Sequence, residues 1–72
     1  MQQVGMAEIE KIFAITDPMG IHRESVMIPL GPRNPGSVKR KANGKFEIVV
    51  DASMDFDVWL GGLEAALRAA GA

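Results

Sequence analysis

The sequence predicts a single small α+β domain, in which a C-terminal amphipathic helix packs on one face of an antiparallel sheet of about three strands. Asn43-Gly44 separates two segments with β-forming residues, and this dipeptide is a strong hairpin signal. From residue 56 onward, apolar side chains recur at spacings of three and four, as on one face of a helix. The chain has 72 residues and no cysteine, so packing, or packing together with self-association, must stabilise its one domain. The expected order is a helix, three strands and a second helix.

Residues 6–15 are expected to form the first helix, because their apolar side chains also fall at spacings of three and four. Isoleucine and phenylalanine suit strands as well, so a fourth strand over residues 8–15 is the alternative. Asp17-Pro18 ends the element, since the residue before a proline avoids the α region. Residues 1–5 show no periodic pattern and are expected to be a disordered tail.

Residues 25–30 are expected to form the first strand, because the segment is apolar and contains β-branched residues. Pro29 cannot donate a hydrogen bond to a neighbouring strand, so this strand lies at an edge of the sheet or ends there. Residues 31–36 contain two glycines and two prolines and are expected to form a loop.

The hairpin can form in two registers that differ in which face of the sheet carries the basic side chains. A two-residue turn at residues 43–44 would place Lys39 on the face of Ile48. A three-residue loop at residues 42–44, with a bulge, places Lys39 opposite Glu47 on the solvent face and requires the stem of Arg40 to lie along the sheet. A one-residue slip exchanges the two faces, and burial of the apolar face favours the bulged register.

The C-terminal helix is expected to be capped by Ser53 and to end at Gly71. Trp59 lies on its apolar face and is expected to anchor the core. Gly61 and Gly62 fall in the helix interior, where each glycine costs about 1 kcal/mol relative to alanine. Close packing of the helix on the sheet would explain both glycines. The alternative is an interface in which Trp59, Gly61 and Gly62 contact another subunit.

Charge is segregated along the chain. Residues 25–46 contain five basic residues and no acidic one, so the segment carries +5. The remaining residues hold three basic and nine acidic side chains, a charge of −6, which gives the total of −1. The basic residues of the segment are Arg33, Lys39, Arg40, Lys41 and Lys45. They are the candidate binding residues, either for an acidic protein or, alternatively, for nucleic acid phosphates. Lysines on a hairpin also protect an edge strand against aggregation without binding anything.

Catalytic and metal chemistry find little support in the sequence. The only histidine is His22, which would need Asp17 or Glu24 to orient it as a base. Asp51, with the two aspartates that follow at residues 55 and 57, lacks the spacing of a calcium loop. We therefore expect a protein that is not an enzyme and has no metal or other cofactor. The lack of cysteine favours the cytoplasm, and no segment is apolar enough for a membrane span.

The order helix, strand, then R-K-x-x-G-K-F-E-I-V-V-D-A-S over residues 40–53, then helix, resembles the start of HExxH zinc metallopeptidase-like domains of phages and mobile elements. The resemblance covers about residues 6–60. In that family the next helix carries the HExxH motif, whereas residues 59–63 here read W-L-G-G-L. The resemblance therefore implies a truncated, non-catalytic relative that shares the fold, and it transfers no functional residue.

The expected function is a small protein-interaction module of bacterial type, without catalytic activity. Apolar side chains that so small a domain cannot cover, including Trp59 and Met27, suggest a homodimer or a partner interface. The alternative is a nucleic-acid-binding protein that uses the basic hairpin from Lys39 to Lys45.

Overall fold

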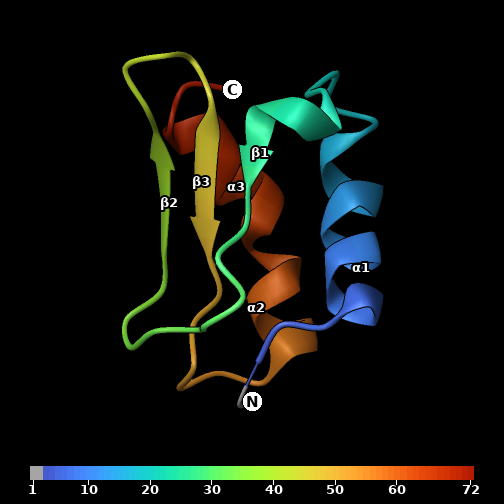
Figure 1. The fold of residues 1–72 in the computed structure, drawn as a ribbon, viewed down its shortest axis with the longest axis vertical. Helices are drawn as coiled ribbons and strands as arrows, with labels where there is room; N and C mark the ends of the chain where they lie inside the picture. The colour runs from blue at the N-terminus through green and yellow to red at the C-terminus, as the bar shows by residue number, and fades with distance from the viewer. Residues whose placement is uncertain (1–2) are drawn as a thin grey trace.

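The computed structural model describes residues 3–72, in which helices pack against a three-stranded sheet, so the expected α+β class is confirmed (Figure 1). In chain order the elements are helix α1 (Met6–Thr16), a 3₁₀ turn (Arg23–Ser25), strands β1 (Val26–Met27), β2 (Ser37–Arg40) and β3 (Phe46–Val49), and helices α2 (Phe56–Gly61) and α3 (Leu63–Ala69). Helices α2 and α3 lie across one face of the sheet, and α1 stands beside them (Figure 1). None of the helices within residues 3–72 has the length and hydropathy needed to cross a bilayer.

The sheet is mixed, with the strand order β1-β3-β2. Strands β2 and β3 are antiparallel, as expected, but β1 runs parallel to β3. The parallel pair arises because the chain after β1 passes the end of β3 before it returns as β2 on the far side (Figure 1). At this crossing the Arg33 amide donates to the Val50 carbonyl at 3.0 Å, and the Ala52 amide donates to the Arg33 carbonyl at 2.8 Å. The expected strand over residues 25–30 is therefore much shorter, and Ser25 belongs to the 3₁₀ turn.

The bulged hairpin register is confirmed. Val38 pairs with Ile48, and Lys39 pairs with Glu47. Within the loop, the positive φ of Gly44, 84°, is a backbone conformation that suits glycine and turns the chain back into β3. The face of the hairpin that packs against the helices therefore carries no lysine side chain.

The helical prediction for residues 6–15 is confirmed by α1, and the alternative strand is wrong. The prediction of a disordered tail over residues 1–5 is wrong for the residues that the structure describes. Residues 1–2 lie outside the described residues, but Val4 is only 2% exposed and its amide donates to the Leu30 carbonyl at 2.7 Å. The Gly5 amide then donates to Glu8 Oε1 at 2.9 Å, which satisfies an amide at the start of α1. A hydrophobic contact that sequence periodicity does not encode therefore fixes this segment.

The C-terminal helix is divided in two, and its cap differs from the prediction. Asp55, not Ser53, caps α2, because its carboxylate accepts a hydrogen bond from the Val58 amide at 3.4 Å. The Ser53 amide instead donates to Asp51 Oδ1 at 2.8 Å. Gly62, with φ −100° and ψ 0°, ends α2 and begins α3.

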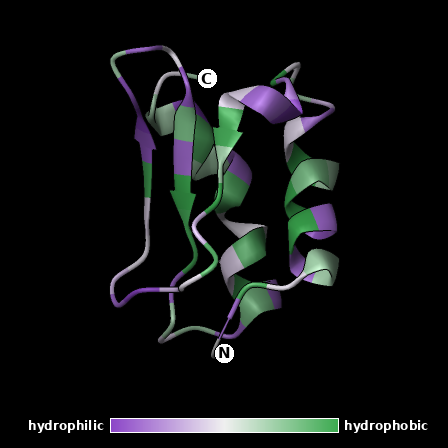
Figure 2. Cartoon of the chain, viewed as in Figure 1, coloured by the Kyte–Doolittle hydropathy of each residue, from purple (hydrophilic) through white to green (hydrophobic). Residues whose placement is uncertain are grey.

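The core lies between β3 and the helices. Figure 2 shows hydrophobic residues along β3 and on the helices. Phe46, Ile48 and Val50 form a cluster with Leu63 and Leu67, so the C-terminal helical segment packs on one face of the sheet as the sequence predicts. Two further buried members come from the N-terminal part of the chain, Val4 and Ile12. Trp59 packs against this cluster but is only partly buried.

Candidate interaction site

The basic hairpin is the candidate site, and its local structure follows from the loop sequence. The Gly44 amide donates to the Lys41 carbonyl at 2.9 Å, and the Lys41 amide donates to the Lys45 carbonyl at 2.7 Å. The side-chain oxygen of Asn43, Oδ1, accepts a hydrogen bond from the Lys45 amide at 3.0 Å, which further stabilises the loop. These bonds hold a tight loop at one end of the sheet, where both lysines are exposed to solvent.

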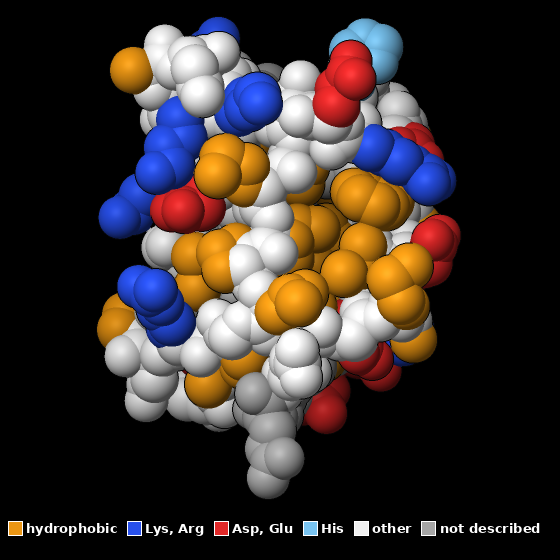
Figure 3. Space-filling view, in the orientation of Figure 1, with side chains coloured by type: hydrophobic (Ala, Val, Ile, Leu, Met, Phe, Trp, Pro, Cys, Tyr) orange, Lys and Arg blue, Asp and Glu red, His pale blue; other side chains and the backbone are white. Residues whose placement is uncertain are grey.

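Four cations and one carboxylate make up the hairpin surface, which consists of Lys39, Arg40, Lys41, Lys45 and Glu47. Lys39 lies opposite Glu47 on the face that the helices do not cover, and Lys41 Nζ approaches Glu47 Oε2 at 3.6 Å. Figure 3 shows basic side chains along this side of the molecule with an acidic group among them. A single carboxylate cannot neutralise the group, so the hairpin presents net positive charge.

Arg40 has a second role besides its charge. Arg40 lies opposite Phe46 in the β2–β3 pair, and its guanidinium carbon lies 6.0 Å from the centre of the Phe46 ring. The aliphatic stem therefore runs along the apolar face, as the bulged register requires. Replacement of Arg40 would remove packing together with charge, which makes it a poor residue for testing charge alone.

Arg33 is not part of the hairpin surface. Its backbone pairs with that of Asp51, beyond the end of β3 that is distant from the hairpin loop. The structure therefore brings together four of the five basic residues that the sequence singled out. The linear charge pattern groups Arg33 with the others because it does not reveal that the chain crosses the sheet between them.

The alternative interface predicted from the sequence lies on α2 and at its junction with α3, and it consists of Trp59, Gly61 and Gly62. Both glycines are exposed. A Cβ atom at Gly61 would meet nothing within 4 Å, and one at Gly62 would lie 3.7 Å from the Trp59 carbonyl. Close packing on the sheet, the favoured explanation from the sequence, is therefore wrong. Gly62 instead marks the break between the two helices.

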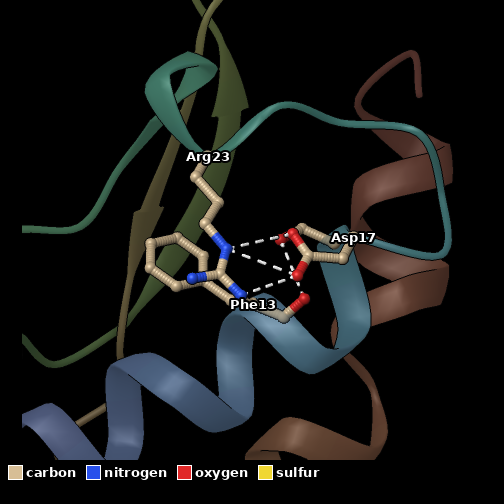
Figure 4. A network of polar contacts seen from close by, with 4 residues as sticks. Phe13, Asp17 and Arg23 are labelled. Atoms are coloured by element: carbon tan, nitrogen blue, oxygen red, sulfur yellow. Dashed lines mark hydrogen bonds and ion pairs between the residues drawn. The ribbon is translucent and has the colours of Figure 1, made fainter.

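Asp17 does not orient His22. Its carboxylate accepts hydrogen bonds from Arg23, whose Nη2 lies 2.9 Å from Asp17 Oδ2 (Figure 4). The same guanidinium stacks over the Phe13 ring at 4.7 Å from its centre. Hydrogen bonding and charge from Arg23 lower the pKa of Asp17, and the reciprocal contact raises the pKa of Arg23. This cluster ties the 3₁₀ turn to α1, and its groups already have partners.

Asp51 is a structural residue of the crossing. Its carboxylate accepts hydrogen bonds from Ser53 and, at 3.1 Å, from the Gly36 amide. Side-chain and backbone hydrogen bonds from Ser53, with the one from Gly36, lower the pKa of Asp51 because they stabilise its charged form. Within residues 3–72 no three acidic or histidine side chains come together to hold a metal ion.

Residues 3–72 also enclose no pocket. In comparisons with known proteins, the chain matches no family model, no curated protein and no solved structure. The resemblance to HExxH metallopeptidase-like domains accordingly stays a prediction from the sequence.

Proposed function

We propose that this chain is a small, non-catalytic, cytoplasmic interaction module of bacterial type that binds an acidic segment of another protein through the hairpin surface. The observation that supports this most directly is the bulged register, because it directs Lys39 and Lys41 to solvent beside a single carboxylate, Glu47. The cytoplasmic location is supported by the absence of cysteine from the sequence.

An acidic protein is favoured over nucleic acid because of the aromatic residues. Nonspecific binding of single strands combines cations with aromatic side chains on which bases stack. Phe46 is 7% exposed and lies beneath Arg40, so it offers no face to a base. Trp59 packs against the core from α2, on the helical side of the sheet. The hairpin therefore provides phosphate-binding charge without a stacking platform.

The proposal is tested by titrating the protein with the peptide acetyl-Glu-Val-Glu-Val-Glu-Val-Glu-amide at low salt. We expect binding that weakens as salt is added. Lys39→Gln, Lys41→Gln and Lys45→Gln together should lower the affinity by about tenfold, since exposed ion pairs contribute up to about 1 kcal/mol each. Lys11→Gln is the matched control, because Lys11 is an exposed lysine paired with Asp57 on the helical side.

Two results would contradict the proposal. One is no detectable binding of the peptide at low salt. The other is retention of an oligothymidylate with a steep salt dependence and no peptide binding, which would favour the nucleic acid alternative.

A further inference from the structure

Strand β2 forms one edge of the sheet, and among residues 3–72 it pairs with β3 alone. In Figure 1 no helix or strand lies beyond β2 on that side. The other edge differs. There, Pro29 follows β1, and the Val4 amide donates to the Leu30 carbonyl, so the N-terminal segment covers part of it. The two edges of the sheet are thus unequal, and β2 is the more open one.

The hairpin hydrogen bonds determine which backbone groups of β2 are free. In an antiparallel pair, residues that exchange hydrogen bonds alternate with residues that do not. The bond from the Lys41 amide to the Lys45 carbonyl sets the phase of this alternation. Lys39 therefore exchanges bonds with β3, whereas the N–H and C=O groups of Val38 and Arg40 point toward the open edge. None of the turn and loop hydrogen bonds within residues 3–72 uses these groups.

The charges on this edge discriminate among possible occupants. Antiparallel pairing of β2 with β2 of a second copy would bring together the basic side chains of both, and like charges across paired strands are destabilising. An acidic strand would instead place its carboxylates beside Lys39 and Lys41. A bound nucleic acid would leave the outward-pointing N–H and C=O groups of Val38 and Arg40 without strand partners.

We infer that β2 binds an acidic extended segment of a partner protein by β-strand addition, so that the sheet gains a fourth strand. This inference deepens the proposed function and rests on it. The partner strand exchanges backbone hydrogen bonds with Val38 and Arg40. Its side chains alternate: carboxylates lie beside Lys39 and Lys41 on the face away from the helices, and apolar groups lie beside Val38 and the stem of Arg40.

The experiment uses the whole chain and two probes of equal charge. The first probe is acetyl-Glu-Val-Glu-Val-Glu-Val-Glu-amide, which matches the alternation. The second replaces each valine with proline, which removes the N–H groups that would face Val38 and Arg40 and keeps every carboxylate. We expect the valine peptide to bind at least about tenfold more tightly, since backbone hydrogen bonds contribute about 1 kcal/mol each.

The variant Val38→Pro blocks the edge without changing the charge of the protein. The Val38 amide does not bond to β3, so proline at this position removes a group that only a partner would use. Val38→Thr is the matched control, because it keeps the amide and the branched shape. We expect Val38→Pro to weaken the valine peptide by about tenfold and to leave the proline peptide unchanged.

Amide hydrogen exchange of the unmodified protein provides a readout that does not depend on any variant folding. With the valine peptide bound at saturation, exchange at Val38 and Arg40 should slow by at least about tenfold. Exchange at Lys39 should be slow both with and without peptide, because its amide already bonds to β3.

The outcomes separate this inference from the proposed function. Equal affinity for both peptides, or unchanged exchange at Val38 and Arg40 in the saturated complex, would overturn strand addition and leave charge-based binding standing. If neither peptide binds, both proposals fail. Tight binding of the valine peptide with protection of both amides would support both.

Discussion

Gly36 occupies a position where a side chain has no room. An ideal Cβ there would lie 2.6 Å from both the Asp51 nitrogen and the Val49 carbonyl oxygen. Both are backbone atoms at the end of β3, so they cannot move as a flexible side chain would. We expect Gly36→Ala to lower the free energy of unfolding by about 1–3 kcal/mol, as overpacking does, and urea denaturation would measure the change.

Gly31 is the control for this prediction. It belongs to the same loop, but a Cβ there would meet nothing within 4 Å. Gly31→Ala should change the free energy of unfolding by less than about 0.5 kcal/mol, as surface substitutions usually do. Equal losses in the two variants would show that loop flexibility, and not the close approach at Gly36, controls the crossing.

Asp51 should make stability depend on pH in the acid range. Its folded pKa is lowered, so it contributes stability above its unfolded pKa of about 3.9, and that contribution is lost as pH falls through the folded value. Asp51→Asn should be less stable than the wild type at neutral pH, because a neutral oxygen accepts weaker hydrogen bonds than a carboxylate. Below about pH 4 the difference should shrink.

Urea midpoints of both proteins between neutral pH and the acid range would check this. Asp17, whose pKa is also lowered, titrates in both proteins and cancels from the comparison. A constant difference between the two proteins at every pH would contradict a charged role for Asp51.

At the scale of elements, the hairpin could be predicted from the sequence because two independent signals agree. Asn43-Gly44 locates the turn, and the need to bury Phe46 and Ile48 on one face selects the register. Helix α1 could be predicted for a similar reason, since its apolar spacing and the stop at Asp17-Pro18 agree. Each of these signals is local in the chain.

Elements and contacts that depend on distant residues could not be predicted in this way. The direction of β1 is decided by where the loop after it crosses the sheet, and Gly36 takes part in that crossing only because it lies against Asp51. The role of Arg23 cannot be predicted from periodicity, because its partners Phe13 and Asp17 lie across a turn with no periodic spacing. The amide of Val38, on which the inferred strand addition depends, is a backbone group that composition cannot reveal.

Gly61, at the end of α2, has room for a side chain, and adding one should stabilise the protein. It is helical, exposed, and without neighbours within 4 Å of a built Cβ. We expect Gly61→Ala to raise the free energy of unfolding by about 0.5–1 kcal/mol, because alanine loses less backbone entropy on folding. Thermal unfolding monitored by circular dichroism would measure this.

Gly44 gives the opposite case within the same chain. Its φ of 84° is strained for any residue with a Cβ, so Gly44→Ala should be destabilising although a Cβ there meets nothing. A destabilising Gly61→Ala would indicate that the α2 surface contacts something outside the described chain, such as a second subunit.

At the scale of the whole molecule, the surface of α2 is the place to look for self-association. The radius of gyration is 11.1 Å, close to the value of about 11 Å expected for a compact domain of this length. Apolar side chains nevertheless remain exposed on α2 and just before it, with Val58 at 66% and Met54 at 41%. They lie close in sequence to Trp59, Gly61 and Gly62, the interface suggested by the sequence.

We expect a homodimer that forms through this surface, with sedimentation that depends on protein concentration. Val58→Lys should shift the equilibrium toward the monomer by introducing like charges at the contact, and it should leave stability nearly unchanged because the side chain is exposed. Lys45→Gln, in the exposed hairpin loop, serves as a surface control. A wild-type monomer at all concentrations would rule out the dimer.

The contact between Gly71 and Arg40 has a practical consequence. A Cβ built on Gly71 would be 3.3 Å from the Arg40 guanidinium, so this residue lies beside the hairpin. The sequence has no cysteine, so Ala72→Cys would provide a single thiol for a fluorophore. A fluorophore at that position would stand close to β2, and its emission should change when that strand is occupied.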